Sequence, residues 1–88
     1  MRLRLEIVNE KGLHARASAK FVETVERFDA SATVSRDGMT VPGDSIMGLM
    51  TLVAARGTHI EVITDGRDAE ALASALRTLV AGRFGEDF

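Results

Sequence analysis

Residues 58–80 read THIEVITDGRDAEALASALRTLV and contain a strand pattern followed by a helix pattern. Its first part alternates and is rich in β-branched side chains, which predicts a half-buried strand with Ile60 and Val62 facing inward. Asp65-Gly66 indicates a turn, and the residues after it trace an amphipathic helix that closes near a glycine. The apolar positions of that helix are Ala69, Leu72, Ala73, Leu76, Leu79 and Val80. A strand and a helix that each hide one face indicate a two-layer α+β packing.

The residues before this stretch continue the alternation of strand and helix patterns. Residues 2–7 alternate as a strand, and residues 9–12 break that pattern as a turn. Apolar residues at helical spacing predict a helix over Ala15–Arg27. A hairpin follows, with strands over Ser31–Arg36 and Met39–Val41 joined by an Asp-Gly turn and stopped by Pro-Gly. The inward-facing residues of the first two strands are Leu3, Leu5, Ile7, Ala32 and Val34.

A short helix over Ile46–Leu52 completes the order β-α-β-β-α-β-α. Asp44 and Ser45 open it because both are favourable N-cap types, and Gly57 ends the segment that follows. This order predicts an α+β open-faced sandwich. Three helices cover one face of a four-stranded, mainly antiparallel sheet, and water covers the other face. Such a fold supports many functions, so the function has to be argued from a site.

The composition narrows the class of protein. The chain has 88 residues, which fits one domain spanning residues 1–88, and its apolar fraction of 45% excludes a disordered chain. A net charge of −2 and the absence of Trp and Tyr argue against nucleic-acid binding. No apolar run is long enough for membrane insertion. Because the chain has no cysteine and no apolar leader, we expect a cytoplasmic protein without disulfides or thiolate metal sites.

The segment at residues 12–16, Gly-Leu-His-Ala-Arg, is the one that indicates chemistry, because it places a histidine at the start of the first predicted helix. The leading N–H groups of a helix have no intrahelical acceptor, and the helix dipole adds partial positive charge there. The N–H groups of Ala15, Arg16 and Ala17 are therefore expected to hold an anion. The same field disfavours an imidazolium, so His14 is expected to be neutral, with a lone pair free for nucleophilic attack.

Two motifs carry a family resemblance. Residues 12–22, GLHARASAKFV, closely resemble the phosphorylation segment of HPr, the histidine-containing phosphocarrier family of the bacterial phosphotransferase system. Residues 44–52, DSIMGLMTL, resemble the second signature of that family, around its regulatory serine. Because the element order and the chain length also agree, the resemblance spans essentially the whole chain.

The resemblance implies a role for each matching residue. His14 would accept a phosphoryl group at Nδ1 from phosphohistidine on enzyme I, which phosphoenolpyruvate charges, and pass it to a histidine of an enzyme IIA. Arg16 would assist at the active centre. Ser45 would be the target of HPr kinase/phosphorylase. The residues expected to form the partner interface are Lys20, Ile46, Met47 and Met50.

The same resemblance implies a carrier rather than an autonomous enzyme. We expect a monomer that needs no metal and no organic cofactor. His59 is predicted to face solvent from the polar side of its strand, and its spacing from His14 does not suit a local metal site.

Two positions have competing interpretations. The family usually carries proline where this chain has Ala17, so proline's rigidity is lost while a backbone N–H is gained. We hypothesise that this extra donor offsets part of the lost rigidity. Ser45 is explained either as a helix N-cap, which needs no kinase, or as a phosphorylation switch beside an apolar docking patch.

Other functions remain open at this point. The acidic Glu23 and Glu26 and the terminal segment Phe84–Phe88 resemble the nitrogen-regulatory branch of the system, as an alternative to sugar uptake. A regulatory paralogue that binds partners in a Ser45-dependent way without relaying phosphate is a second reading. A small ligand-binding α/β regulatory domain is a third, and it leaves the segment around His14 unexplained.

Overall fold

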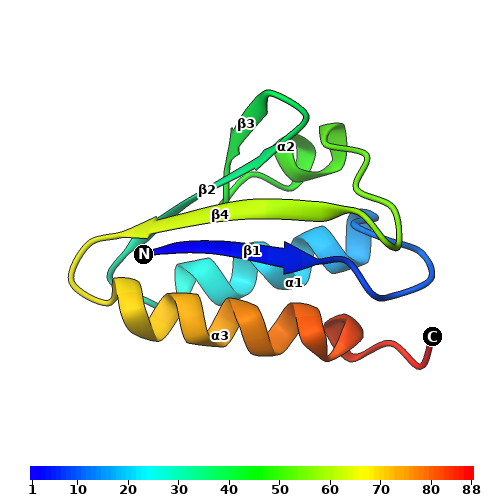
Figure 1. Cartoon of the computed structure of the whole chain (residues 1–88). Helices are drawn as coiled ribbons and strands as arrows, with labels where there is room; N and C mark the ends of the chain where they lie inside the picture. Colours follow the sequence, from blue (N-terminus) through cyan, green and yellow to red (C-terminus); the bar gives the residue numbers. More distant parts are fainter.

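The computed structural model describes residues 1–88 and contains one sheet with helices packed against one of its faces (Figure 1). The strands are β1 (Arg2–Glu6), β2 (Ser31–Arg36), β3 (Met39–Pro42) and β4 (His59–Asp65). Their spatial order is β1-β4-β2-β3, and every neighbouring pair is antiparallel. The helices are α1 (Ala15–Glu26), α2 (Ile46–Thr51), α3 (Ala69–Ala81) and the 3-10 turn η1 (Arg83–Gly85). The predicted α+β open-faced sandwich is confirmed.

Strand alternation sorts the side chains of the sheet into a buried and an exposed face. Val62 in β4 lies opposite Leu3 in β1 and Val34 in β2, and all three are buried under the helices. One residue along, Arg4 lies opposite Glu61 on the face that carries no helix, and both are exposed. Each fully buried aliphatic side chain contributes roughly 1.5–3 kcal/mol, so this pattern fixes which face the helices cover.

The predicted element boundaries hold to within one or two residues. Helix α1 begins at Ala15 as predicted and ends at Glu26, with Arg27 as its C-cap. The hairpin prediction needs one correction, because Pro42 belongs to β3 and pairs with Thr33 rather than stopping the strand before it. Proline is tolerated there because β3 is an edge strand and Pro42 is its last residue, so its missing N–H removes no ladder bond.

The C-terminal tail, residues 83–88, has a structure that the hydrophobic pattern does not predict. Arg83 and Phe84 both have positive φ angles, 59° and 54°, which turn the chain sharply after α3. Left-handed backbone costs about 1–2 kcal/mol per residue, and complete burial of the Phe84 ring offsets it. The backbone N–H of Glu10 donates to the carbonyl of Phe88 over 2.9 Å, so the tail lies beside the loop after β1 (Figure 1).

None of the helices combines the length and the apolar character required to cross a lipid bilayer.

Candidate functional site

A glycine positions the loop that leads into α1. Gly12 has a φ of +68°, and a Cβ added there would lie 2.5 Å from the carbonyl oxygen of Ala54. The next residue, Leu13, is buried and donates its N–H to the same carbonyl over 2.9 Å. Only glycine combines this backbone conformation with so close an approach. The loop is therefore fixed against the segment after α2 immediately before the histidine.

His14 is the N-cap residue of α1, as predicted. Its backbone is extended, and its Nδ1 accepts a hydrogen bond from the backbone N–H of Arg16 over 3.3 Å. This bond satisfies one of the N–H groups that the first turn leaves without an intrahelical acceptor. The side chain is 28% exposed, so the ring is supported on one side and accessible on the other.

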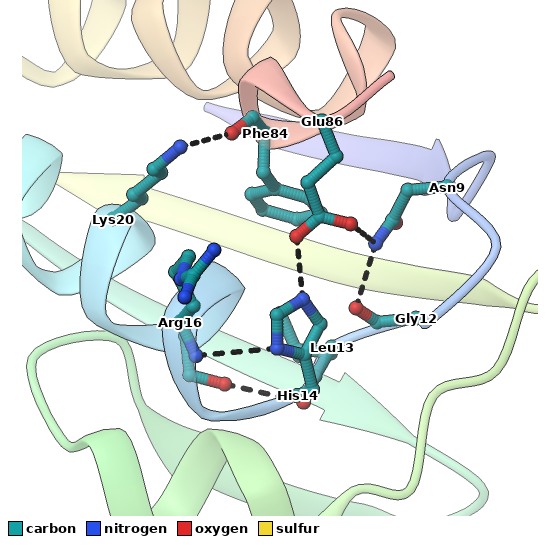
Figure 2. A network of polar contacts seen from close by, with 9 residues as sticks. Asn9, Gly12, Leu13, His14, Arg16, Lys20, Phe84 and Glu86 are labelled. Carbon is teal, nitrogen blue, oxygen red and sulfur yellow. Dashed lines mark hydrogen bonds and ion pairs between the residues drawn. The ribbon is translucent and has the colours of Figure 1, made fainter. Parts of the chain in front are cut away.

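The other ring nitrogen of His14 contacts the C-terminal tail (Figure 2). Nε2 lies 2.5 Å from Oε2 of Glu86. The second oxygen of that carboxylate, Oε1, accepts a hydrogen bond of 3.0 Å from Nδ2 of Asn9, which also donates to the carbonyl of Gly12 over 2.8 Å. The tail thus connects the loop after β1 to the ring of His14. Figure 2 shows that this network joins Asn9 and His14, near the N-terminus, to Glu86, near the C-terminus.

The hydrogen-bond partners assign the proton on the ring. Because Nδ1 of His14 accepts from an N–H, it carries no proton in the neutral ring, and Nε2 donates to the carboxylate of Glu86. Burial alone raises the pKa of Glu86. The hydrogen bonds from His14 and Asn9 and the charges of His14 and Lys11 outweigh burial, so the pKa of Glu86 lies below its ordinary 4.5.

This contact qualifies the prediction of a neutral imidazole. The helix end disfavours positive charge on His14, as argued from the sequence, but the carboxylate of Glu86 at Nε2 favours it. Two opposing influences therefore act on one ring. The sequence around His14 indicates only the influence of the helix end.

Charged side chains of both signs line the cleft beside the ring. An open cleft of about 340 Å³ runs from His14 to the tail and contains Arg16, which is exposed and whose guanidinium makes no hydrogen bond or ion pair. The remaining charged residues that line it are Glu10, Lys11, Lys20, Glu86 and Asp87. An exposed, unpaired guanidinium next to the histidine is suited to bind phosphoryl oxygens.

Lys20 takes part in the tail structure. Its ammonium donates to the carbonyl of Phe84 over 2.6 Å, and the side chain is half-buried (Figure 2). The sequence predicted Lys20 as a partner-facing residue. The structure gives it a contact within the chain, which leaves its remaining N–H donors for a partner.

An apolar surface lies beside the histidine. Met47 is 73% exposed at the start of α2, as predicted, and Ile46 and Met50 are also exposed. A shallow groove connects this surface to the site, because Met50 and His14 line it together. Val53 lines the same groove, is 74% exposed and has a positive φ, which the sequence did not indicate.

Ser45 caps helix α2. Its Oγ accepts a hydrogen bond of 2.9 Å from the backbone N–H of Gly48, and the residue is half-buried. The capping interpretation is therefore confirmed. His59 is exposed on the helix-free face of the sheet, in a polar hollow separate from His14. No group of three or more His, Cys, Asp or Glu side chains is placed to hold a metal ion.

Sequence reasoning missed Glu86, Asn9 and Phe84. Glu86 follows His14 by 72 residues and carries no local pattern, so only the packed tail brings the two together. Asn9 was assigned to a turn, but it is completely buried. The burial of Asn9 would have indicated a structural role for its side chain. The polar turn sequence of residues 9–12 does not reveal that burial.

Comparisons with known proteins match the part of the chain that contains His14, Arg16 and Ser45. A family model described as "PTS HPr component phosphorylation site" matches residues 1–82. Phosphocarrier protein HPr of Neisseria meningitidis serogroup B is 50% identical over 82 residues, covering 93% of this chain and 92% of the relative. That of Xylella fastidiosa strain Temecula1 is 46% identical over 83 residues, covering 94% and 93%. The crystal structure of HPr-C-His from Thermoanaerobacter tengcongensis has a TM-score of 0.94 at 36% identity, covering 100% of this chain and 99% of that one.

Proposed function

This chain belongs to the HPr family of the bacterial phosphotransferase system, and from that membership we propose a phosphoryl relay centred on Nδ1 of His14. The family role is that of a phosphocarrier that works with the enzymes of this system. His14 accepts the phosphoryl group from phosphohistidine on enzyme I and passes it to a histidine of an enzyme IIA. The observation that carries the proposal is the hydrogen bond that Nδ1 accepts from the N–H of Arg16 at a helix start, because it leaves Nδ1 of the neutral ring without a proton.

The transfer is an in-line displacement at phosphorus. The Nδ1–P bond forms as the N–P bond on enzyme I breaks, and the reverse sequence delivers the group to enzyme IIA. Once Nδ1 binds phosphorus, the N–H of Arg16 is free to donate to a phosphoryl oxygen. The N–H groups of Ala15 and Ala17 lie in the same first turn, and the unpaired guanidinium of Arg16 adds charge.

The partners dock on the apolar surface beside the site. Flexible thioethers suit a surface that receives two different proteins, and Met47 and Met50 supply them. Ile46 extends this surface, and the remaining donors of Lys20 meet acidic groups of a partner. Both partners use the one surface, so enzyme I leaves before enzyme IIA binds.

Ser45 is the proposed regulatory site. A phosphate on its Oγ would place about two negative charges next to Ile46 and Met47, which disfavours docking through desolvation and repulsion. HPr kinase/phosphorylase is the partner that performs this step. ATP-dependent labelling in host extract tests it: we expect label on the wild-type protein and none on Ser45→Ala, and an unlabelled wild-type protein rejects the proposal.

The protein acts as a substrate of other enzymes in the cytoplasm and as a monomer, without a metal or an organic cofactor. All the chemistry it contributes comes from one ring and the amides and guanidinium around it. The second half of each transfer site comes from the partner.

Labelled phosphoenolpyruvate and enzyme I test the relay. The wild-type protein is expected to take up acid-labile label, because phosphohistidine hydrolyses in acid. His14→Ala is expected to take up none, and His59→Ala is the matched control that keeps the label, because it removes the other histidine of the chain. A wild-type protein without label would reject the relay and favour the paralogue that only binds partners through Ser45.

A further inference from the structure

The contact between the C-terminal tail and His14 lies outside the part of the chain that the family model matches, which is residues 1–82. We propose that Glu86 is a positioning residue for phosphoryl transfer. It keeps the proton on Nε2 of His14 throughout the reaction and stabilises the positive charge that the ring acquires when Nδ1 binds phosphorus. This inference rests on the proposed function of His14.

The geometry selects one tautomer of the neutral ring. A carboxylate at Nε2 requires a donor there, and the N–H of Arg16 at Nδ1 requires an acceptor there. The opposite tautomer would set an N–H against an N–H at Nδ1 and a lone pair against a carboxylate at Nε2. Glu86 and Arg16 therefore both hold the ring in the tautomer whose Nδ1 carries no proton, and the Nδ1 lone pair attacks phosphorus when its hydrogen bond to the N–H of Arg16 breaks.

Charge balance gives Glu86 a role during the step itself. When the Nδ1 lone pair forms the N–P bond and the bond to the donor breaks, the ring keeps its Nε2 proton and becomes an imidazolium. No proton has to move, because the carboxylate of Glu86 already faces that nitrogen. In the onward transfer the electron pair of the N–P bond returns to Nδ1, and a neutral ring leaves more readily than an anionic one.

The carboxylate is held in place by contacts other than the histidine. Asn9 donates to Oε1 of Glu86, and the side chain of Glu86 is 16% exposed. On one side of it the ring of Phe84 is completely buried and its carbonyl accepts from Lys20. On the other side the carbonyl of Phe88 accepts from Glu10. Because both flanks are anchored, the position of Glu86 does not depend on the ring.

Other charged groups line the cleft without contacting the ring. Lys11, Arg16 and Lys20 supply positive charge there, and Glu10 and Asp87 supply negative charge. None of these makes a hydrogen bond to Nε2, which has one partner. The specific stabilisation of an imidazolium therefore comes from Glu86, and the others set a background field.

Glu86→Gln tests the proposal, because the amide keeps the size and an acceptor oxygen but removes the charge. We expect the rate of phosphoryl transfer at saturating enzyme I to fall about tenfold, with KM for enzyme I unchanged, because the interaction strengthens only as the ring becomes charged. Glu61→Gln is the matched control: it makes the same change at an exposed glutamate on the helix-free face of the sheet and is expected to leave both parameters unchanged.

Nitrogen NMR of the unphosphorylated ring provides a second readout that a merely structural role would not move. In the wild-type protein and in Glu61→Gln, we expect the proton of His14 on Nε2. In Glu86→Ala, which removes the acceptor, we expect part of the population to carry it on Nδ1. Thermal unfolding of each variant shows whether the fold is retained.

The outcomes separate the inference from the relay. If the wild-type protein takes label on His14 while Glu86→Gln transfers at the wild-type rate, the relay stands and the inference is wrong. A loss in Glu86→Gln that appears only in KM, or an equal loss in Glu61→Gln, also overturns it. If the wild-type protein takes no label, both fail together.

Discussion

Oε2 of Glu86 lies 2.5 Å from Nε2 of His14, although the two residues are 72 positions apart in the chain. The contact closes the C-terminal tail over the first turn of α1. A residue near one end of the chain thereby contacts a ring near the other end. Stability and phosphoryl transfer are both expected to respond to it.

Acid should weaken the contribution of Glu86 to stability. Its pKa is lowered in the folded protein below the ordinary 4.5, so the carboxylate favours folding at pH values above that ordinary value. The contribution is lost as the pH falls through the lowered folded pKa. Urea unfolding should therefore show a difference in unfolding free energy between the wild-type protein and Glu86→Gln at pH 7 that shrinks towards pH 2. A difference that grows below pH 4 would contradict this.

Gly12→Ala should destabilise the protein strongly. The new Cβ would meet the carbonyl of Ala54 at 2.5 Å in a left-handed backbone conformation, and the expected loss is about 2–4 kcal/mol. Gly38→Ala is the matched control, because Gly38 also has a positive φ but no atom within 4 Å of the added Cβ. It should lose only about 1 kcal/mol. Equal losses in chemical denaturation would show that the contact with Ala54 is not what requires glycine.

Met47→Gln should weaken docking without affecting folding. Met47 is 73% exposed, so its replacement should change the unfolding free energy by less than about 0.5 kcal/mol. Loss of an apolar contact in the interface should raise KM for enzyme I about fivefold. Met39→Gln, at an exposed methionine of β3, is the control with unchanged KM. Unaltered kinetics in Met47→Gln would remove Met47 from the docking surface.

Ala17→Pro tests the departure from the family pattern. Proline fits the first turn because the N–H of that residue has no intrahelical acceptor, so the fold should persist. It removes one donor near the phosphoryl oxygens, and the phosphohistidine should hydrolyse about three- to tenfold faster. Following the loss of label over time checks this. Unchanged lifetime and transfer rate would make Ala17 a neutral replacement.

The fold could be predicted from sequence because periodicity is a local property. The alternation around Val62 gives β4 one buried face, and the helical spacing up to Val80 gives α3 one buried face. These two apolar faces are therefore expected to pack against each other. The limits of the elements were accurate where a glycine or an N-cap residue marks them, as at Ser45. The inclusion of Pro42 in β3 was missed because an edge position is a property of the sheet order.

The site could be predicted only where its parts are adjacent in sequence. His14, Arg16 and the first-turn amides belong to one segment, and local helix geometry brings them together. Glu86 reaches the ring only because Phe84 is buried and two residues adopt left-handed backbone conformations after α3. These two residues are Arg83 and Phe84. Because neither is a glycine, the sequence did not indicate the turn after α3.

The proposed relay requires that Nδ1 of His14 carries the phosphoryl group. Nitrogen–phosphorus coupling measured by NMR on the phosphorylated protein, with its two histidines labelled with nitrogen-15, tests it most directly. We expect one coupled ring, that of His14, with phosphorus on Nδ1 and the proton remaining on Nε2. Phosphorus on Nε2, on His59 or on an atom other than nitrogen would contradict it.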